Sequence, residues 1–273
     1  MQSTIFNVAR VLGPSLAAPF LLLLQGNGEG WAFFANGVSY LFVILGLLIV
    51  RTRPVSLAIN TTDHPKPLDE FREGQRFIRN TSLVAIVISM AAIMGFFGFP
   101  PGQQLPVFAR DVLRAVGDTD AIVAARNSAL ATAQGIGALV AAFTLLAFGN
   151  IKRKGLLLTV GSFVFSVALI GLAWSRVLLA ALPSMVVIGW GSVTMLSLMN
   201  MAIQLTVPNE LRGRVFSTYL WALQGVAPFG SLFVGWLTQT LGAPIAVTVC
   251  GVACLLAFTA VNLSTSTVRR FAT

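Results

Sequence analysis

Seven amide side chains and one arginine lie within otherwise apolar stretches of the sequence. An ionisable side chain in lipid is costly and marks a functional site by default, and an amide can hydrogen-bond a ligand or another helix. The chemistry that such residues offer is recognition of a solute by charge and hydrogen bonding in a membrane cavity. The candidates for lining a cavity of this kind are Arg10, Asn36, Gln103, Gln104, Gln134, Asn200, Gln204 and Gln224.

Each candidate also has a structural explanation, which the sequence leaves open. Arg10 lies less than two helical turns from the start of its apolar run, so its guanidinium could reach the lipid headgroups. The amides could hydrogen-bond between helices without contacting a solute.

Other chemistry is poorly supplied. No Asp or Glu lies in the middle of an apolar run, and the single histidine, His64, lies in a polar stretch. Cys250 and Cys254 are one helical turn apart, a spacing typical of packed small side chains. A membrane-embedded enzyme needs such groups gathered near one membrane face. The sequence therefore predicts no enzyme, no metal site and no cofactor.

The composition indicates which elements must position these residues. Of 273 residues, 56% are hydrophobic and 10% are charged, whereas a soluble domain has about 25% charged residues. The mean hydropathy is +0.84. The fold class is therefore predicted to be all-α integral membrane. The net charge of +9 comes from basic residues between apolar runs, so no nucleic-acid partner is predicted.

Membrane helices need about 20 mainly apolar residues. The sequence contains eight runs of that kind and so predicts about eight transmembrane helices. These runs are Ile5–Leu24, Trp31–Val50, Leu83–Val107, Ala124–Phe148, Gly155–Trp174, Val177–Val207, Val215–Thr240 and Ala243–Leu263.

The distribution of basic residues gives the helices a direction. Thirteen of the 18 Lys and Arg residues follow the even-numbered runs, and only four lie at the opposite ends of the runs. Because cytoplasmic loops carry the excess of Lys and Arg, both chain ends are predicted to be cytoplasmic. The predicted location is a multi-pass protein of the plasma (bacterial inner) membrane.

The first two and last two runs form an internal repeat. A shift of 214 positions aligns residues of the same type, with Pro14 on Pro228, Gly28 on Gly242, Gly37 on Gly251, Val38 on Val252 and Leu41 on Leu255. The first run then matches the seventh, so the repeat unit has six helices. We expect residues 1–50 to be the last two helices of an N-terminal bundle whose first four helices are missing. Residues 83–273 are expected to form a complete C-terminal six-helix bundle.

Residues 51–82 are predicted to be a cytoplasmic linker. Leu68, Phe71 and Ile78 are spaced as on one face of a helix, with charged residues between them. This spacing predicts an amphipathic helix at the membrane surface, and a solvated linker is the alternative.

Three segments resemble a known family. Two parallel six-helix units describe the major facilitator transporters. Residues 7–18 resemble the fifth helix of exporters of that superfamily, although Ala9, Ala17 and Ala18 replace favoured glycines. Residues 204–215 and 71–80 are similar to the branch that contains the enterobactin exporter and the macrolide efflux proteins.

This resemblance implies export of a small amphipathic, drug- or siderophore-like molecule by alternating access. The implied partners are the lipid bilayer, the small-molecule substrate, and a proton or other ion acting through the absent helices. The alternative is a non-transporting fragment or partner subunit with no activity alone. The candidate hinge residues are Gly13, Pro14, Pro228 and Gly230. The candidate latch residues are Glu210, Arg212 and Arg214, which could equally be a positive-inside anchor.

Overall fold

The structure is a computed structural model that describes residues 28–49, 67–113, 117–147 and 154–264. Every regular element in these ranges is helical, and none of the described residues forms a strand. Six helical segments are long and apolar enough to cross a membrane within the described part. They are Ser82–Val112, Asp120–Ala147, Lys154–Trp174, Leu178–Thr206, Asn209–Leu241 and Ala243–Asn262. The protein is therefore an all-α integral membrane protein.

The remaining two predicted runs have different outcomes. Ile5–Leu24 lies outside the described residues, and so do Arg10, Gly13 and Pro14. The second run corresponds to α2 (Gly28–Ile49), whose described side chains are exposed. After the shift of 214 positions, α2 begins and ends within one residue of α12 (Ala243–Ser264). The total of eight helices and the division of the chain stay predictions.

Two of the six spans extend five or six residues beyond the runs that the hydropathy predicts. The first continues past Val107 to Val112, and the fifth begins at Asn209 instead of Val215. Asn209 follows Pro208, and Glu210 lies in the first turn, where an acidic side chain is favourable beside the positive end of the helix dipole. The polar residues before Val215 are therefore part of the helix.

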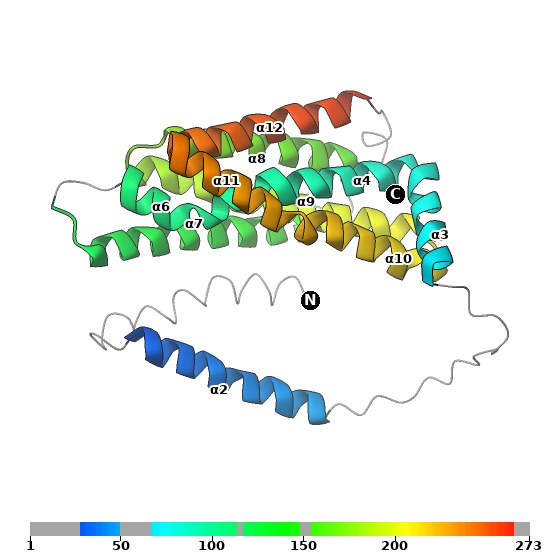
Figure 1. Ribbon diagram of the computed structural model, residues 1–273, viewed down its shortest axis with the longest axis horizontal. Helices are drawn as coiled ribbons and strands as arrows, with labels where there is room; N and C mark the ends of the chain where they lie inside the picture. The colour runs from blue at the N-terminus through cyan, green and yellow to red at the C-terminus, as the bar shows by residue number, and fades with distance from the viewer. Residues whose placement is uncertain (1–27, 50–66, 114–116, 148–153, 265–273) are drawn as a thin grey trace.

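Figure 1 shows the six spans as a bundle of roughly parallel and antiparallel helices. Four spans are single helices, namely α7 (Asp120–Ala147), α8 (Lys154–Trp174), α9 (Leu178–Thr206) and α12 (Ala243–Ser264). The first span is divided into α4 (Ser82–Ile93), the π-helical turn η1 (Met94–Gly98), α5 (Pro100–Gln103), α6 (Leu105–Val107) and the π-helical turn η2 (Phe108–Val112). The fifth is divided into α10 (Asn209–Leu220), the π-helical turn η3 (Trp221–Gly225) and α11 (Ala227–Leu241).

Helices α7 and α9 are in near backbone contact. A Cβ atom at Gly137 would collide with the backbone of Val186, and one at Gly189 would collide with the backbone of Gln134. Glycine is required at both positions because only a hydrogen atom fits between the helices. Beside this contact, the Trp190 indole N–H donates to Thr144 Oγ1 at 3.3 Å.

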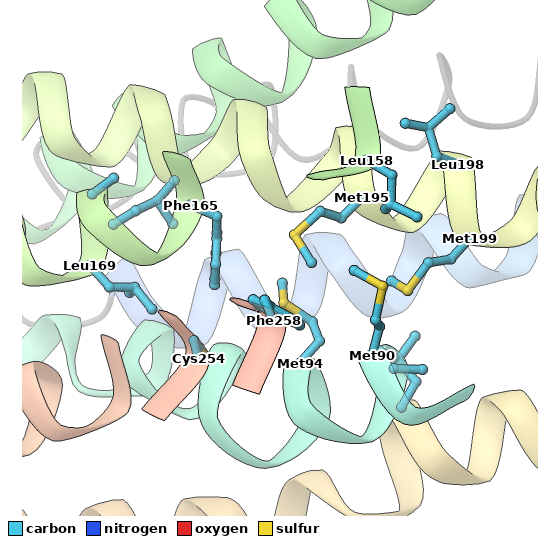
Figure 2. Packing of buried hydrophobic residues seen from close by; sticks show 14 of the residues in the cluster. Met90, Met94, Leu158, Phe165, Leu169, Met195, Leu198, Met199, Cys254 and Phe258 are labelled. Atoms are coloured by element: carbon cyan, nitrogen blue, oxygen red, sulfur yellow. The ribbon is translucent and has the colours of Figure 1, made fainter. Parts of the chain in front are cut away.

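Helices α4, α8, α9 and α12 enclose the core of the bundle. Its side chains are mostly aliphatic, aromatic and sulfur-containing, and methionines of α4, η1 and α9 meet at its centre (Figure 2). The Thr159 hydroxyl donates to Asn262 Oδ1 at 2.7 Å, which ties α8 to α12 near the end of the core. The core residues labelled in Figure 2 are Met90, Met94, Leu158, Phe165, Leu169, Met195, Leu198, Met199, Cys254 and Phe258.

The chain turns at both ends of the bundle in different ways. Between α11 and α12 the link is the single residue Gly242, whose φ of +88° is unfavourable for residues with a side chain. At the other end, the amphipathic segment of the linker is the helix α3 (Pro67–Asn80), which lies across the ends of α4 and α10 (Figure 1). The helical alternative for this segment is thus observed.

Candidate functional site

Two irregular segments meet inside the bundle, and both precede prolines. Pro100 and Pro101 follow η1, and Pro228 follows η3. A proline lacks the N–H that would bond to the carbonyl four residues earlier, and its ring presses on that carbonyl. A π-helical turn re-routes the backbone hydrogen bonds around such a defect, and turns of this kind are frequent at functional sites. In η1, the Phe99 N–H donates to the Met94 carbonyl, five residues back, at 2.9 Å.

The two turns contact one another through glycines. A Cβ atom at Gly95 of η1 would collide with the carbonyl oxygen of Leu223 in η3. In return, a Cβ atom at Gly230 of α11 would collide with the carbonyl oxygen of Phe96 in η1. Each span therefore places a glycine against a backbone carbonyl of the other span.

The Phe96 carbonyl has an unusual position in the chain. Its donors in an α-helix and in a π-helix would be residues 100 and 101, and both are prolines without an N–H. The oxygen lies where a side chain of residue 230 would begin, so a Cα hydrogen of Gly230 faces it. A Cα–H···O contact is weak, and it can lengthen or shift at little cost. The contact between the spans is thus close but not rigid.

Aromatic rings surround this contact on one side. The rings of Phe96 and Phe233 are 5.7 Å apart, and those of Phe97 and Phe233 are 6.3 Å apart between centroids. Phe233 also lies 6.3 Å from Trp236. Ring contacts of this kind are favourable in several offset and tilted arrangements, so they tolerate movement of α11 past η1. We refer to Gly95, Phe96, Leu223 and Gly230 with these rings as the bend contact.

A cavity of about 260 Å³ lies next to the bend contact. Its wall is mostly apolar, with Gln103, Gln134 and Ser192 as the polar side chains. Ligand pockets are usually apolar concavities of roughly 300–1,000 Å³ with a few polar groups that fix orientation, so this cavity has the usual composition but is smaller than that range. The lining residues are Met94, Gly98, Phe99, Pro101, Gly102, Gln103, Leu105, Gln134, Phe165, Leu169, Leu172, Met185, Ile188, Ser192 and Leu196.

The cavity brings together two of the amides that the sequence singles out, Gln103 from α5 and Gln134 from α7. The structure places Gln104 half-buried at the end of α5, beside this cavity but outside its lining. Gln224 is exposed within η3 and so belongs to the bend instead.

The other amides are distributed elsewhere. Asn200 donates its amide N–H to the Leu196 carbonyl of its own helix at 2.9 Å. Gln204 is exposed at the end of α9, and its backbone carbonyl accepts a hydrogen bond from Arg212 at 3.2 Å. Asn36 is exposed on α2, and its carbonyl accepts from the Ser39 hydroxyl at 2.6 Å. These three do not line the cavity.

The candidate hinge residues of the fifth span lie at the bend. Pro228 is in the first turn of α11, directly after η3, and Gly230 makes the close approach to Phe96. Gly95 and Leu223, which complete the bend contact, were not predicted from the sequence. The one available signal was Pro100-Pro101, which predicts a break in the first span at this depth.

The candidate latch residues lie at the start of α10, where Glu210 is exposed in the first turn. Arg214 forms a salt bridge with Glu73 of α3, a residue that the sequence reasoning did not select. Two residues after Glu73, Gln75 donates its amide N–H to Thr218 Oγ1 at 3.1 Å. Arg212 links α10 to the end of α9 through the Gln204 carbonyl. Helix α3 is thus tied to the half of the fifth span that precedes the bend.

Comparison with known proteins identifies a family over nearly the entire chain. The model of the family described as transmembrane secretion effector, a group of major facilitator proteins, matches residues 1–272. No curated protein matches the chain.

Proposed function

Since the chain belongs to the transmembrane secretion effector family of major facilitator transporters, we propose that it exports a small amphipathic, drug- or siderophore-like molecule by alternating access. Membership makes it a multi-pass membrane protein of the secretion and efflux type, and a transporter rather than an enzyme. The class of substrate and the transport cycle are the further steps that we propose here. That the chain belongs to the branch of the enterobactin and macrolide exporters is likewise part of the proposal.

The observation that carries the proposal is the bend contact. Alternating access moves or gates one group of helices against another around a site, and π-helical turns with prolines are identifiable places where a helix can bend during such a movement. The first and fifth spans carry these turns at the same depth, and they touch there through glycine and carbonyl. A movement of the backbone at one bend must therefore displace the backbone at the other.

The cavity supports the proposed class of substrate. Its wall would accept an apolar body, while the amides of Gln103 and Gln134 and the hydroxyl of Ser192 would hydrogen-bond a polar group. No charged side chain is among its lining residues. A neutral or weakly charged amphipathic molecule fits this chemistry better than a small ion.

Ion coupling, if the cycle uses it, is proposed to run outside the described spans. The acidic residues of these spans lie near the span ends, with Asp111 and Asp120 at one end of the bundle and Glu210 at the other. A proton-binding carboxylate would normally lie inside the membrane. We place the protein in the plasma membrane with both ends cytoplasmic, as the distribution of basic residues favours.

The test is export by the complete chain. Proteoliposomes with the reconstituted protein are loaded in turn with an amphipathic dye, a macrolide and a catecholate siderophore, and release is compared with that from empty liposomes. Release of at least one compound is expected, and it should fall when Gln103 and Gln134 are both replaced by Leu. The replacement of exposed Gln239 by Leu is the matched control and should leave release unchanged.

Absence of release for every compound, with folded protein in the membrane, would reject export by this chain alone. Such a result would favour the role of a partner subunit. If release is unchanged when Gln103 and Gln134 are replaced, the protein exports the compound but binds it at a site other than this cavity.

A further inference from the structure

Helix α3 has a second face, which points away from the bundle. Its inner face contains Gly74 and Ile78, both buried, and Gly74 lies close against Arg214 of α10. On the outer side, three arginines are spaced by four and three residues, which places them along one side of a helix. These arginines are Arg72, Arg76 and Arg79, and all three are exposed.

A shallow groove of about 320 Å³ runs along the outer face. Its lining contains the three guanidinium groups and no acidic side chain. The lining residues are Phe71, Arg72, Gln75, Arg76, Arg79 and Asn80.

The acidic residues of α3 do not neutralise this groove. Helix α3 is formally neutral, but Asp69, Glu70 and Glu73 all precede Arg76 along the chain. Asp69 lies 3.5 Å from Arg72 at the upstream end of the groove. Glu73 is turned towards the bundle, where Arg214 binds it. The downstream end of the groove, with Arg76 and Arg79, is therefore positively charged.

The position of α3 indicates what occupies this groove. The first membrane span begins at Ser82, three residues after Arg79, so the groove lies at the depth of the lipid headgroups. Phe71 is 56% exposed and adjoins the arginines, as in interfacial helices that insert an aromatic ring among acyl chains. Guanidinium groups bind phosphate oxygens through two parallel hydrogen bonds, which an ammonium group cannot do.

We propose that this groove is a binding site for the headgroup of an anionic phospholipid of the adjacent leaflet. Arg76 and Arg79 bind the phosphodiester, the Asn80 amide hydrogen-bonds the headgroup, and Phe71 contacts the start of an acyl chain. Because Glu73 and Gln75 tie α3 to α10, a bound lipid also holds the first half of the fifth span. The site is independent of which molecule the protein exports.

The experiment uses the complete chain in neutral detergent with equal amounts of phosphatidylglycerol and phosphatidylcholine. Native mass spectrometry counts the lipids that stay bound. We expect phosphatidylglycerol to be retained preferentially, and Arg76→Gln with Arg79→Gln to lower that retention by about ten- to thirtyfold. The control is Arg212→Gln, which removes an exposed arginine at the same end of the bundle but outside the groove, and it should change retention less than twofold.

Three results would overturn the proposal: equal retention of both lipids, an equal loss in the control variant, or displacement of the lipid by inorganic phosphate at millimolar concentration. A second variant guards against misfolding, because Arg76→Lys with Arg79→Lys preserves the charge. It should bind phosphatidylglycerol about threefold less than the wild type, since the bidentate hydrogen bonds are lost. Unchanged retention in the lysine variant would contradict a site built on guanidinium geometry.

Discussion

Helix α9 and the fifth span both contain a proline, yet they respond to it differently. Helix α9 continues from Leu178 to Thr206 through Pro183, whereas the fifth span changes to a π-helical turn before Pro228. Of the most apolar stretch of each, 50% is buried inside the bundle for α9 and 28% for the fifth span. Helix α9 is held by α7 and α8 along its length.

This comparison shows that a proline alone does not make a flexible bend. The missing hydrogen bond costs about the same in both helices, but α9 is more buried as a whole than the fifth span, and its backbone stays α-helical through Pro183. The fifth span is less buried, and its backbone changes to a π-helical turn before Pro228. Flexibility is therefore expected where a backbone defect and sparse packing coincide.

The largest effect on stability is expected from Gly189→Leu, which disrupts the close contact between α9 and α7. The new side chain would meet the backbone of Gln134 in α7, and backbone cannot move aside as a flexible side chain can. We expect a loss of about 3 kcal/mol or more in the free energy of unfolding, seen as aggregation or a much lower melting temperature in detergent. Gly235→Leu is the control, because a Cβ atom at Gly235 meets nothing within 4 Å. Equal melting of both variants would show that α7 and α9 are not closely packed.

A smaller loss is expected from Gly230→Ala at the bend contact. Its Cβ atom would press on the Phe96 carbonyl, but α11 can shift at the bend, so we expect about 1–2 kcal/mol of destabilisation. Release in the proteoliposome assay should fall severalfold, because the two bends are pushed apart. Gly235→Ala should preserve both stability and release. Normal release from the Gly230→Ala variant would show that transport does not depend on the bend contact.

Replacing the two prolines tests the comparison directly. Pro228→Ala restores an N–H at the bend, so backbone amides of residues 221–229 should exchange hydrogen more slowly, and stability should rise by up to about 1 kcal/mol. Pro183→Ala should alter exchange in α9 much less, since its packing already holds the backbone. Hydrogen exchange with mass spectrometry measures both. Similar changes in the two helices would refute the role of packing.

The smallest effect is expected from the salt bridge between Arg214 and Glu73. Arg214 is 27% exposed and Glu73 is 61% exposed, so water and salt weaken their attraction. A double-mutant cycle with Glu73→Gln and Arg214→Gln should give a coupling of about 0.2–1 kcal/mol that declines with added salt. A coupling well above this range would mean that the pair is shielded from solvent, and that it latches the helix firmly.

The sequence predicts the apolar spans and the prolines well, but not their contacts. Pro228 indicates a bend, because a missing N–H is a local property of the chain. That Gly230 faces Phe96 depends on how two distant helices cross, which hydropathy does not encode. Arg214 is a similar case: nearby Glu210 was the available partner in the sequence, whereas the observed partner Glu73 is 141 residues away.

Gln103 and Gln134 illustrate the same limit for the cavity. Their polarity within apolar runs marks them as candidates, as it does for Asn200 and Gln204. Only the rotation of each helix about its axis decides which amides share a cavity, and that rotation is set by packing. Residue type alone does not distinguish the amides that line the cavity from those that do not.

The one-residue link at Gly242 has a mechanical consequence. Because a single residue joins α11 to α12, the Gly242 end of the fifth span must follow any movement of α12. Helix α10 lies on the other side of the bend from α11. A small rotation at Trp221–Gly225 would then be amplified along the 12 residues of α10 and would displace α3 with it. The protein would open more widely at the end that carries α3 than at the end that carries Gly242.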